Sequence, residues 1–357
     1  MSKEKDYQDF LKLVQLGVGQ DASSLSQDVD WEAMRNLADM HGLTPIVLDG
    51  IERLPLEKRP DKQDLLQWIG EVMNLEMQYD VQKKAANGMA MLFRHNYIRT
   101  YVLKGMVISE CYPKPNHRVG SDLDCFLLPV KGDFDAWAFG NDLMKANGFK
   151  VEDNFYKHSK YILPGLMVES HQFMTPFRCN KRLTKMERIL QKMLKEDKSE
   201  DCLMDSWLLR PPVMVSALFI VEHAYSHFLS DGLSWRHVLD WMMFAKAHRE
   251  DVNWMAFDTM IDEFGLRTFY ESYSRLGRYL LGELALENLT MRDLKMMEDL
   301  WADFDIVEYD RDFKGKLALV GKIWRARWKY HYFSEISMVH AIWIYAVGYL
   351  FVKNPKL

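Results

Sequence analysis

The chain has 357 residues, of which 48% are hydrophobic and 27% are charged, and its formal net charge is −5 at pH 7. This length allows two or three domains, and the composition is that of an ordinary soluble globular protein. The weakly negative balance lacks the electrostatic footprint of a nucleic-acid-binding protein, so nucleic acid is not an expected partner.

Cysteine use and the first residues predict the compartment. The four cysteines are scattered and form no C-x-x-C pair, which argues against a zinc ribbon and against a disulfide framework. The N-terminal residues are polar and acidic, unlike a secretory signal peptide. Together these features predict a cytoplasmic protein.

Residues 1–98 predict an N-terminal helical region. Two short helices are expected within residues 31–54, because Gly42 can end the first and Thr44 with Pro45 suits the start of the second. From residue 64 to residue 97, apolar residues recur at helical spacing over a length that requires packing partners. No pattern in this region indicates chemistry.

Residues 99–178 mix strands with short helices and predict a small α/β core. Tyr101–Leu103 predicts a first strand, and Gly105 allows the backbone to turn sharply into a short helix. A loop then leads to Arg118. Ser121 precedes an apolar run that predicts a buried second strand. A crossover helix and a hairpin of two further strands are expected downstream, at residues 134–147, 157–163 and 166–173.

Asp122 and Asp124 stand at the start of the second strand. Side chains at positions i and i+2 of a strand point to the same face, so the two carboxylates project together. Two like charges this close repel each other unless a cation lies between them, and carboxylate oxygens are the ligands that Mg²⁺ prefers. The pair therefore predicts a site for Mg²⁺, with Mn²⁺ as the alternative ion.

The last strand of the core carries Glu169 and His171 on one face. Apolar residues surround Glu169, so its carboxylate needs a partner. As a third carboxylate aimed at the Asp pair, it completes a two-metal site for transfer of a phosphoryl or nucleotidyl group. His171 has three interpretations: a donor behind the metal ligands, a general base, or a strand histidine with satisfied hydrogen bonds, and the last is favoured.

The order of these motifs resembles the DNA polymerase β-like nucleotidyltransferase superfamily, with a Gly-ended strand, Asp-x-Asp on a second strand and a lone acid on a later one. More narrowly, the chain resembles a bacterial family of uncharacterised nucleotidyltransferases. That family is similar in this region to the nucleotidyltransferase-like proteins of abortive-infection systems. The resemblance extends to the helical flanks, at residues 37–45 and 233–240.

The resemblance implies a nucleoside triphosphate as donor substrate. Gly105 then lies beside the phosphates, where main-chain N–H groups meet anionic oxygens. Lys104 either neutralises phosphate charge or is a solvent-exposed lysine at a strand end. Arg118 either bridges the Asp pair or clamps a phosphate, and the clamp is favoured. Ser121 and His171 complete the nucleotide-binding residues predicted within the core.

One departure from the superfamily pattern concerns the phosphate-binding turn. Many members have Gly-Ser shortly before the Asp pair, whereas here Gly105 is followed by Met106 and lies 17 residues before Asp122. The departure puts in doubt the form of this turn and, with it, the identity of the donor.

Residues 179–357 predict a C-terminal helical domain. Thr184 and Glu187 have the spacing of a capping box and predict a helix start. An apolar helix is expected at residues 213–229, where His223 and His227 stand at i and i+4. That spacing can ligate a metal ion, but no third ligand type lies nearby, so two histidines lining the active-site cleft are favoured.

Ser234 predicts the cap of a following helix that carries Arg236 and Asp240. In families of this architecture a helical domain closes the nucleotide cleft, which implies that Arg236 reaches the site. The alternative, an ion pair between Arg236 and Asp240 within the helix, is favoured. Further on, basic and aromatic residues at 314–333 precede an uncharged run at 338–352. Peripheral membrane contact through this run is the less favoured interpretation, and a buried terminal helix is preferred.

The sequence therefore predicts an α+β fold: a small mixed-sheet nucleotidyltransferase core flanked by N-terminal and C-terminal helical regions. The predicted function is metal-dependent transfer of a nucleoside monophosphate from a nucleoside triphosphate to a hydroxyl acceptor, which is a small molecule, a sugar or a protein. Asp122, Asp124 and Glu169 are the predicted catalytic residues and metal ligands. The alternatives are a kinase on the same core, or a non-catalytic nucleotide-binding or toxin–antitoxin-type interaction protein.

Overall fold

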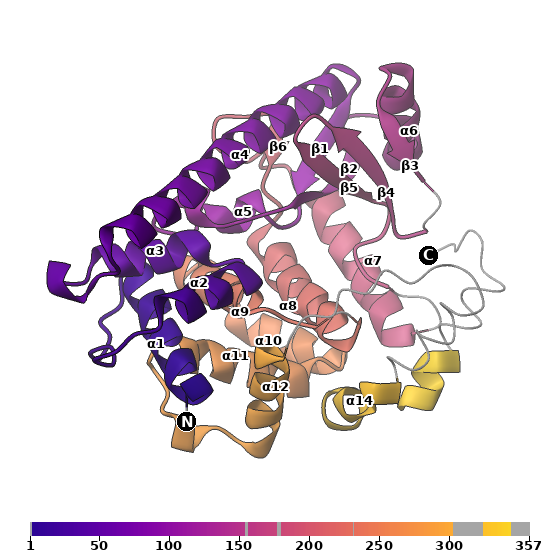
Figure 1. Ribbon diagram of the computed structural model, residues 1–357. Coiled ribbons are helices and arrows are strands. Elements are labelled where there is room, and N and C mark those ends of the chain that lie inside the picture. The colour runs from indigo at the N-terminus through magenta and orange to yellow at the C-terminus, as the bar shows by residue number, and fades with distance from the viewer. Residues whose placement is uncertain (1, 154–155, 177–179, 231, 303–323, 344–357) are drawn as a thin grey trace.

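The computed structural model describes residues 2–153, 156–176, 180–230, 232–302 and 324–343. It is an α+β fold in which helices flank one six-stranded mixed sheet, so the predicted fold class is confirmed (Figure 1). Much of the predicted basic, aromatic segment and of the apolar terminal helix, at residues 314–323 and 344–352, lies outside the described residues.

The elements follow the predicted order of helices, mixed core and helices. The N-terminal helices are α1 (Ser2–Gly17), α2 (Trp31–Met40), α3 (Thr44–Glu52), η1 (Leu56–Lys58) and α4 (Lys62–His95). The mixed core contains β1 (Ile98–Val102), α5 (Met106–Ser109), η2 (Pro115–His117), β2 (Asp122–Pro129), α6 (Ala136–Ala146), β3 (Lys150–Glu152), β4 (His158–Leu163) and β5 (Leu166–His171). The C-terminal elements are α7 (Lys181–Glu196), β6 (Leu208–Leu209), α8 (Val213–Ser230), α9 (Trp235–Ala247), α10 (Trp254–Glu263), α11 (Arg267–Leu280), η3 (Leu286–Asn288), α12 (Met291–Trp301) and α14 (Arg327–Phe333).

The strands lie in the order β3-β4-β5-β2-β1-β6. β2 pairs in parallel with β5 and antiparallel with β1, and the predicted hairpin is the antiparallel pair β4–β5. β6 pairs in parallel with β1 and comes from the C-terminal part of the chain. The sequence did not indicate β6, because two residues are too short to carry a periodic pattern.

Alternation along β2 divides its side chains between two cores. Leu123, Cys125 and Leu127 pack in the core beneath α4 and α6, whereas Phe126 and Leu128 belong to a larger core formed with the C-terminal helices. A strand that is apolar on both faces is buried on both. β2 is therefore a central strand between two helical layers.

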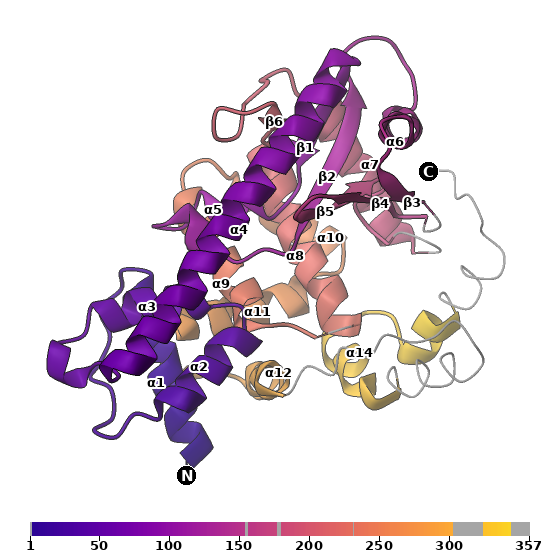
Figure 2. The same ribbon diagram turned by 45° about the horizontal axis from the view of Figure 1, so that its top comes forward.

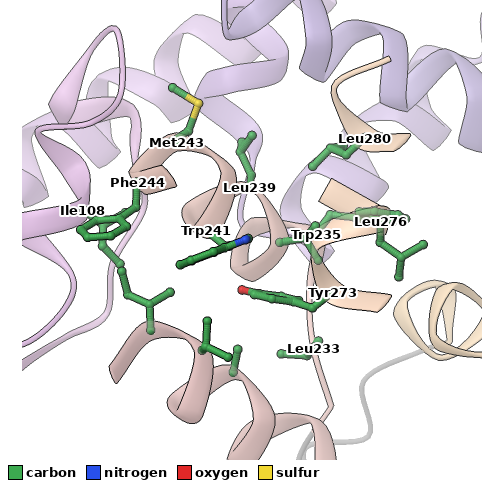
Figure 3. Packing of buried hydrophobic residues seen from close by; sticks show 14 of the residues in the cluster. Ile108, Leu233, Trp235, Leu239, Trp241, Met243, Phe244, Tyr273, Leu276 and Leu280 are labelled. Carbon is green, nitrogen blue, oxygen red and sulfur yellow. The ribbon is translucent and has the colours of Figure 1, made fainter. Parts of the chain in front are cut away.

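The N-terminal and C-terminal helices share that larger core. Trp235 and Trp241 of α9 and Tyr273 of α11 are fully buried and lie together with Ile108 of α5 (Figure 3). The long helix α4 spans the molecule, from the N-terminal helices to the sheet (Figures 1 and 2). The sheet thus sits on helical layers that contain both flanking regions.

Both α7 and α8 were predicted from the sequence, and α7 begins earlier than predicted. α7 begins at Lys181 because Asn180 is its N-cap, with Oδ1 accepting from the main-chain N–H groups of Arg182 and Leu183 at 3.0 and 3.2 Å. The predicted N-cap at Thr184 is therefore wrong by four residues. α8 is long and apolar enough to cross a membrane, but 67% of it is buried inside the fold, as in the core helix of a globular protein.

Candidate functional site

Three acidic side chains share the face of the sheet that meets the C-terminal helices. Asp122 and Asp124 stand at i and i+2 on β2, on the same side as Phe126, which packs in the core with those helices. On the parallel neighbour β5, Glu169 is in register with Asp124. Cross-strand partners point to the same face, so the three carboxylates project from one face of the sheet.

Asp124 is buried and its first partner is His171, two residues beyond Glu169 on β5. His171 Nε2 lies 2.9 Å from Asp124 Oδ1, and His171 Nδ1 lies 3.1 Å from the main-chain oxygen of Phe173. Burial by itself raises the pKa of Asp124, but the hydrogen bond from His171 and the charges of His171 and Lys104 outweigh it and hold this pKa well below its usual range.

Glu169 is half-buried and faces three cationic or imidazole groups. Lys160 Nζ lies 3.2 Å from Glu169 Oε1, His158 Nε2 lies 3.4 Å from the same oxygen, and His171 Nε2 lies 4.0 Å from Oε2. Burial is the main cause that lowers the pKa of His158, to about 3, and the charge of His171 adds to it. His158 is therefore a neutral imidazole at neutral pH.

His158, Glu169 and His171 form a compact group of potential metal ligands. One ligand atom from each lies within 4.8 Å of the others. The sequence did not single out His158, although it stands opposite His171 in the register of the β4–β5 hairpin. A correct strand alignment was the signal that could have found it.

Asp122 begins β2 at the rim of this face and is only partly buried. Ser121 Oγ lies 3.4 Å from Asp122 Oδ1, a long hydrogen bond at an exposed position. Ser121 is accordingly open to solvent, and Asp122 is partly so.

Lys104 and Gly105 follow β1 beside the Asp pair. The main-chain N–H of Leu103 donates to the main-chain oxygen of Asp124 at 2.9 Å, which continues the ladder up to this point. Gly105 has φ +68° and ψ −103°, a conformation that favours glycine, and it precedes α5. Lys104 is 9% exposed, so the alternative of a solvent-exposed lysine is wrong.

Burial and the neighbouring charges act on the pKa of Lys104 in opposite directions. Burial is the largest cause that lowers its pKa, which falls to about 8, and the charges of Arg118 and Arg236 act in the same direction. The carboxylates of Asp124 and Asp240 oppose them. An anion placed beside Lys104 would raise this pKa again, because an opposite charge favours the ammonium form.

Arg118 pairs with Asp240 of α9 rather than with the Asp pair of β2. Its Nη2 and Nε donate to the two carboxylate oxygens at 2.7 and 3.1 Å, and the hydroxyl of Tyr112 donates to Oδ1 at 2.8 Å. Burial raises the pKa of Asp240, but the Arg118 charge outweighs it and the pKa stays below its usual value. The guanidinium is thus held bidentately inside the protein.

Arg236 does not follow the favoured prediction of an ion pair with Asp240. Its Nη1 donates to the main-chain oxygen of Val119 at 2.6 Å, and the carboxylate of Asp240 is taken by Arg118. Arg236 and Arg118 therefore both fasten the loop before Asp122 to α9. The sequence missed this arrangement because Arg118 and Asp240 are 122 residues apart.

The histidines of α8 and α9 lie behind Lys104. His223 and His227 are brought together, with their Nε2 atoms 3.0 Å apart, and His223 and His237 line a cavity of about 10 Å³ together with Lys104. Burial is the main cause that lowers the pKa of His223 and of His237 well below the usual value, followed by the charge of Lys104. The sequence identified the α8 pair but missed His237, whose Nδ1 accepts from the main-chain N–H of Ser234 at 3.1 Å.

Comparison with known proteins adds one finding. The model of a family described as uncharacterised nucleotidyltransferase matches residues 27–282, well over half of the chain. The matched range includes the sheet, the loop that carries Arg118, and α8 and α9. No curated protein and no solved structure matches the chain.

Proposed function

The chain belongs to the family of uncharacterised nucleotidyltransferases, and from that premise we propose that it transfers a nucleoside monophosphate from a nucleoside triphosphate to a hydroxyl acceptor in a metal-dependent reaction. The observation that carries the proposal is the register of Asp124 with Glu169 on parallel strands, with Asp122 on the same face. A general nucleotidyltransferase role follows from the family. The metal, the acceptor and the residue roles below are our proposal.

The donor set fits a hard divalent cation. Asp122, Asp124 and Glu169 supply carboxylate oxygens on one face, and such oxygens are the preferred ligands of Mg²⁺ and Mn²⁺. His171 contacts Asp124 at Oδ1 and so orients the carboxylate. When bound, a divalent cation supplies positive charge to the phosphate oxygens on which negative charge builds during transfer.

Lys104 and Gly105 are the residues we assign to the triphosphate. Lys104 is buried beside Asp124, and its ammonium gains an opposite charge when phosphate oxygens approach. Gly105 keeps its side of the turn free of a side chain, so main-chain N–H groups can approach an anion. Ser121 is exposed beside Asp122, where its hydroxyl can donate a hydrogen bond to a phosphate oxygen or to a ribose hydroxyl.

Arg118 and Arg236 have positioning roles in this proposal. The bidentate contact with Asp240 occupies Arg118, so a phosphate clamp would first have to break a buried ion pair. Arg236 binds the Val119 oxygen two residues before Ser121. Both arginines hold the loop from which Asp122 projects.

Glu169 is the candidate base for the acceptor. Its carboxylate keeps 16% of its side-chain surface exposed, so a hydroxyl can approach it from solvent. The acceptor oxygen forms a bond to the α-phosphorus, its proton passes to Glu169, and the bond to the pyrophosphate oxygen breaks. The products are the nucleotidylated acceptor and pyrophosphate.

The experiment follows the products of nucleotides labelled at the α or the γ phosphate. With Mg²⁺ or Mn²⁺ and a panel of hydroxyl acceptors, we expect pyrophosphate release and transfer of the α label, and both are lost in Asp122→Asn and Asp124→Asn. Ser230→Ala, at the exposed end of α8, is the matched control and keeps the activity. Transfer of the γ label with release of a nucleoside diphosphate would replace the proposal by a kinase. Nucleotide binding without turnover would leave a non-catalytic binding protein.

A further inference from the structure

We propose that His158, Glu169 and His171 form a site for a borderline-soft transition-metal ion, with Zn²⁺ the best fit, beside the Asp122–Asp124 position. Ligand atoms from these three residues lie within 4.8 Å of one another, on the adjacent strands β4 and β5. The inference rests on the proposed function only for the use that the ion would have there. Binding itself requires no nucleotide.

The distances are close to those of a bound tetrahedral ion. Ligand bonds of about 2.0–2.1 Å separate tetrahedral ligands by about 3.4 Å. His158 Nε2 and Glu169 Oε1 are already 3.4 Å apart, and His171 Nε2 is 4.0 Å from Glu169 Oε2. Small side-chain rotations therefore bring the three ligands onto one ion.

The ligand types select the ion. Two imidazoles and a carboxylate form a zinc ligand set, whereas Mg²⁺ prefers oxygen ligands and keeps its waters. The surroundings also match a metal-binding histidine, because such a histidine commonly donates its other ring N–H to a main-chain carbonyl. His171 Nδ1 makes that contact with the oxygen of Phe173, which makes Nε2 the ligand nitrogen, and the ion would replace the present contact of Nε2 with Asp124 Oδ1.

Lys160 is the group that the ion would displace. Its Nζ lies 3.2 Å from Glu169 Oε1 and now offsets the charge of the carboxylate. The Lys160 side chain is 37% exposed and flexible, so it can turn to solvent at low cost. A bound dication would then supply the positive charge that Lys160 withdraws.

The test measures metal binding to the metal-free full chain by equilibrium dialysis, with Co²⁺ visible absorption as an independent sign of imidazole ligation. We expect Zn²⁺ to bind at least about 100-fold more tightly than Mg²⁺. In His158→Ala and in the more conservative His158→Asn, Zn²⁺ affinity falls at least about tenfold while circular dichroism is unchanged. Mg²⁺ affinity stays within about twofold in both variants, because His158 is no ligand of a hard cation.

His227→Ala is the control, since it removes a histidine from the i, i+4 pair on α8, which also has metal-ligand spacing. Equal affinity for Zn²⁺ and Mg²⁺, unchanged Zn²⁺ binding in both His158 variants, or loss of binding in His227→Ala alone would each overturn the inference. Zn²⁺ binding without pyrophosphate release would leave the site standing and remove the proposed function. Pyrophosphate release without Zn²⁺ binding would overturn the inference and leave the proposed function standing.

Discussion

The Asp240→Asn variant should unfold at a markedly lower denaturant concentration than the parent protein. The substitution keeps the size of the side chain but removes the charge that faces the Arg118 guanidinium. Both partners are almost fully buried, with side-chain exposures of 4% for Arg118 and 2% for Asp240. The guanidinium cannot lose its proton in response, because an arginine stays charged at any accessible pH.

The size of the effect follows from this burial. Removing one partner of a buried ion pair leaves an uncompensated charge and typically costs about 3–5 kcal/mol. The Asp240 carboxylate also accepts from Tyr112 at 2.8 Å, and an asparagine oxygen cannot satisfy all the donors that now share two oxygens. We therefore expect the free energy of unfolding to fall by about 3–5 kcal/mol, which is a large part of the stability of a typical domain.

Urea unfolding followed by tryptophan fluorescence measures this loss, because Trp235 and Trp241 are buried on the same helix. The control is the triple variant Arg118→Met, Asp240→Leu and Tyr112→Phe, in which no polar group is left without its partner. Its stability should lie within about 1 kcal/mol of the parent or above it. A loss below about 1 kcal/mol in Asp240→Asn would mean that the pair behaves as an exposed one and would refute the argument.

Three further perturbations have defined outcomes. Gly105→Ala forces an L side chain into φ +68° and should cost about 1–3 kcal/mol in thermal unfolding. Gly50→Ala places a Cβ 2.1 Å from the Leu13 main-chain oxygen and should lower the free energy of unfolding by about 1–3 kcal/mol. Gly70→Ala, which has open space around it on α4, should raise the free energy of unfolding by about 0.5–1 kcal/mol. Equal effects of the two substitutions would contradict the packing around Gly50. Burial lowers the pKa of Lys104 from 10.5 to about 8, so between pH 8 and 10.5 the unfolded chain binds more protons than the folded chain. The free energy of unfolding should therefore rise with pH across this window. The rise should be absent in Lys104→Met.

Local sequence patterns predicted the two strands that carry the candidate site. The alternation of Asp122, Leu123 and Asp124 before an apolar run placed both carboxylates on one side of a strand, and the strand is β2. The same reasoning placed Glu169 with His171 on β5. These inferences succeeded because strand periodicity depends only on neighbouring residues.

Contacts between distant segments were not predictable in the same way. Arg236 and Asp240 have the spacing of an intrahelical ion pair, yet Asp240 bonds Arg118, which comes from a loop 122 residues earlier. Local spacing gives an exposed pair only a few tenths of a kcal/mol, so a buried bidentate contact overrides it. His158 is a different case, because the register of the predicted hairpin, with Leu163 opposite Leu166, already places it opposite His171.

The contacts of Arg118 and Arg236 explain how α9 helps to position Asp122. Asp122 projects from the end of a loop that contains Arg118, and that loop is held by Asp240 and Arg236 of α9. Without α9 the guanidinium would have no buried acceptor and would turn to solvent with the loop, because an unpaired charge is not retained in a protein interior. Asp124, by contrast, is fixed within the sheet by His171. The two carboxylates project from one face because they stand at i and i+2 on β2, and α9 faces them because it packs on the larger core that Phe126 shares.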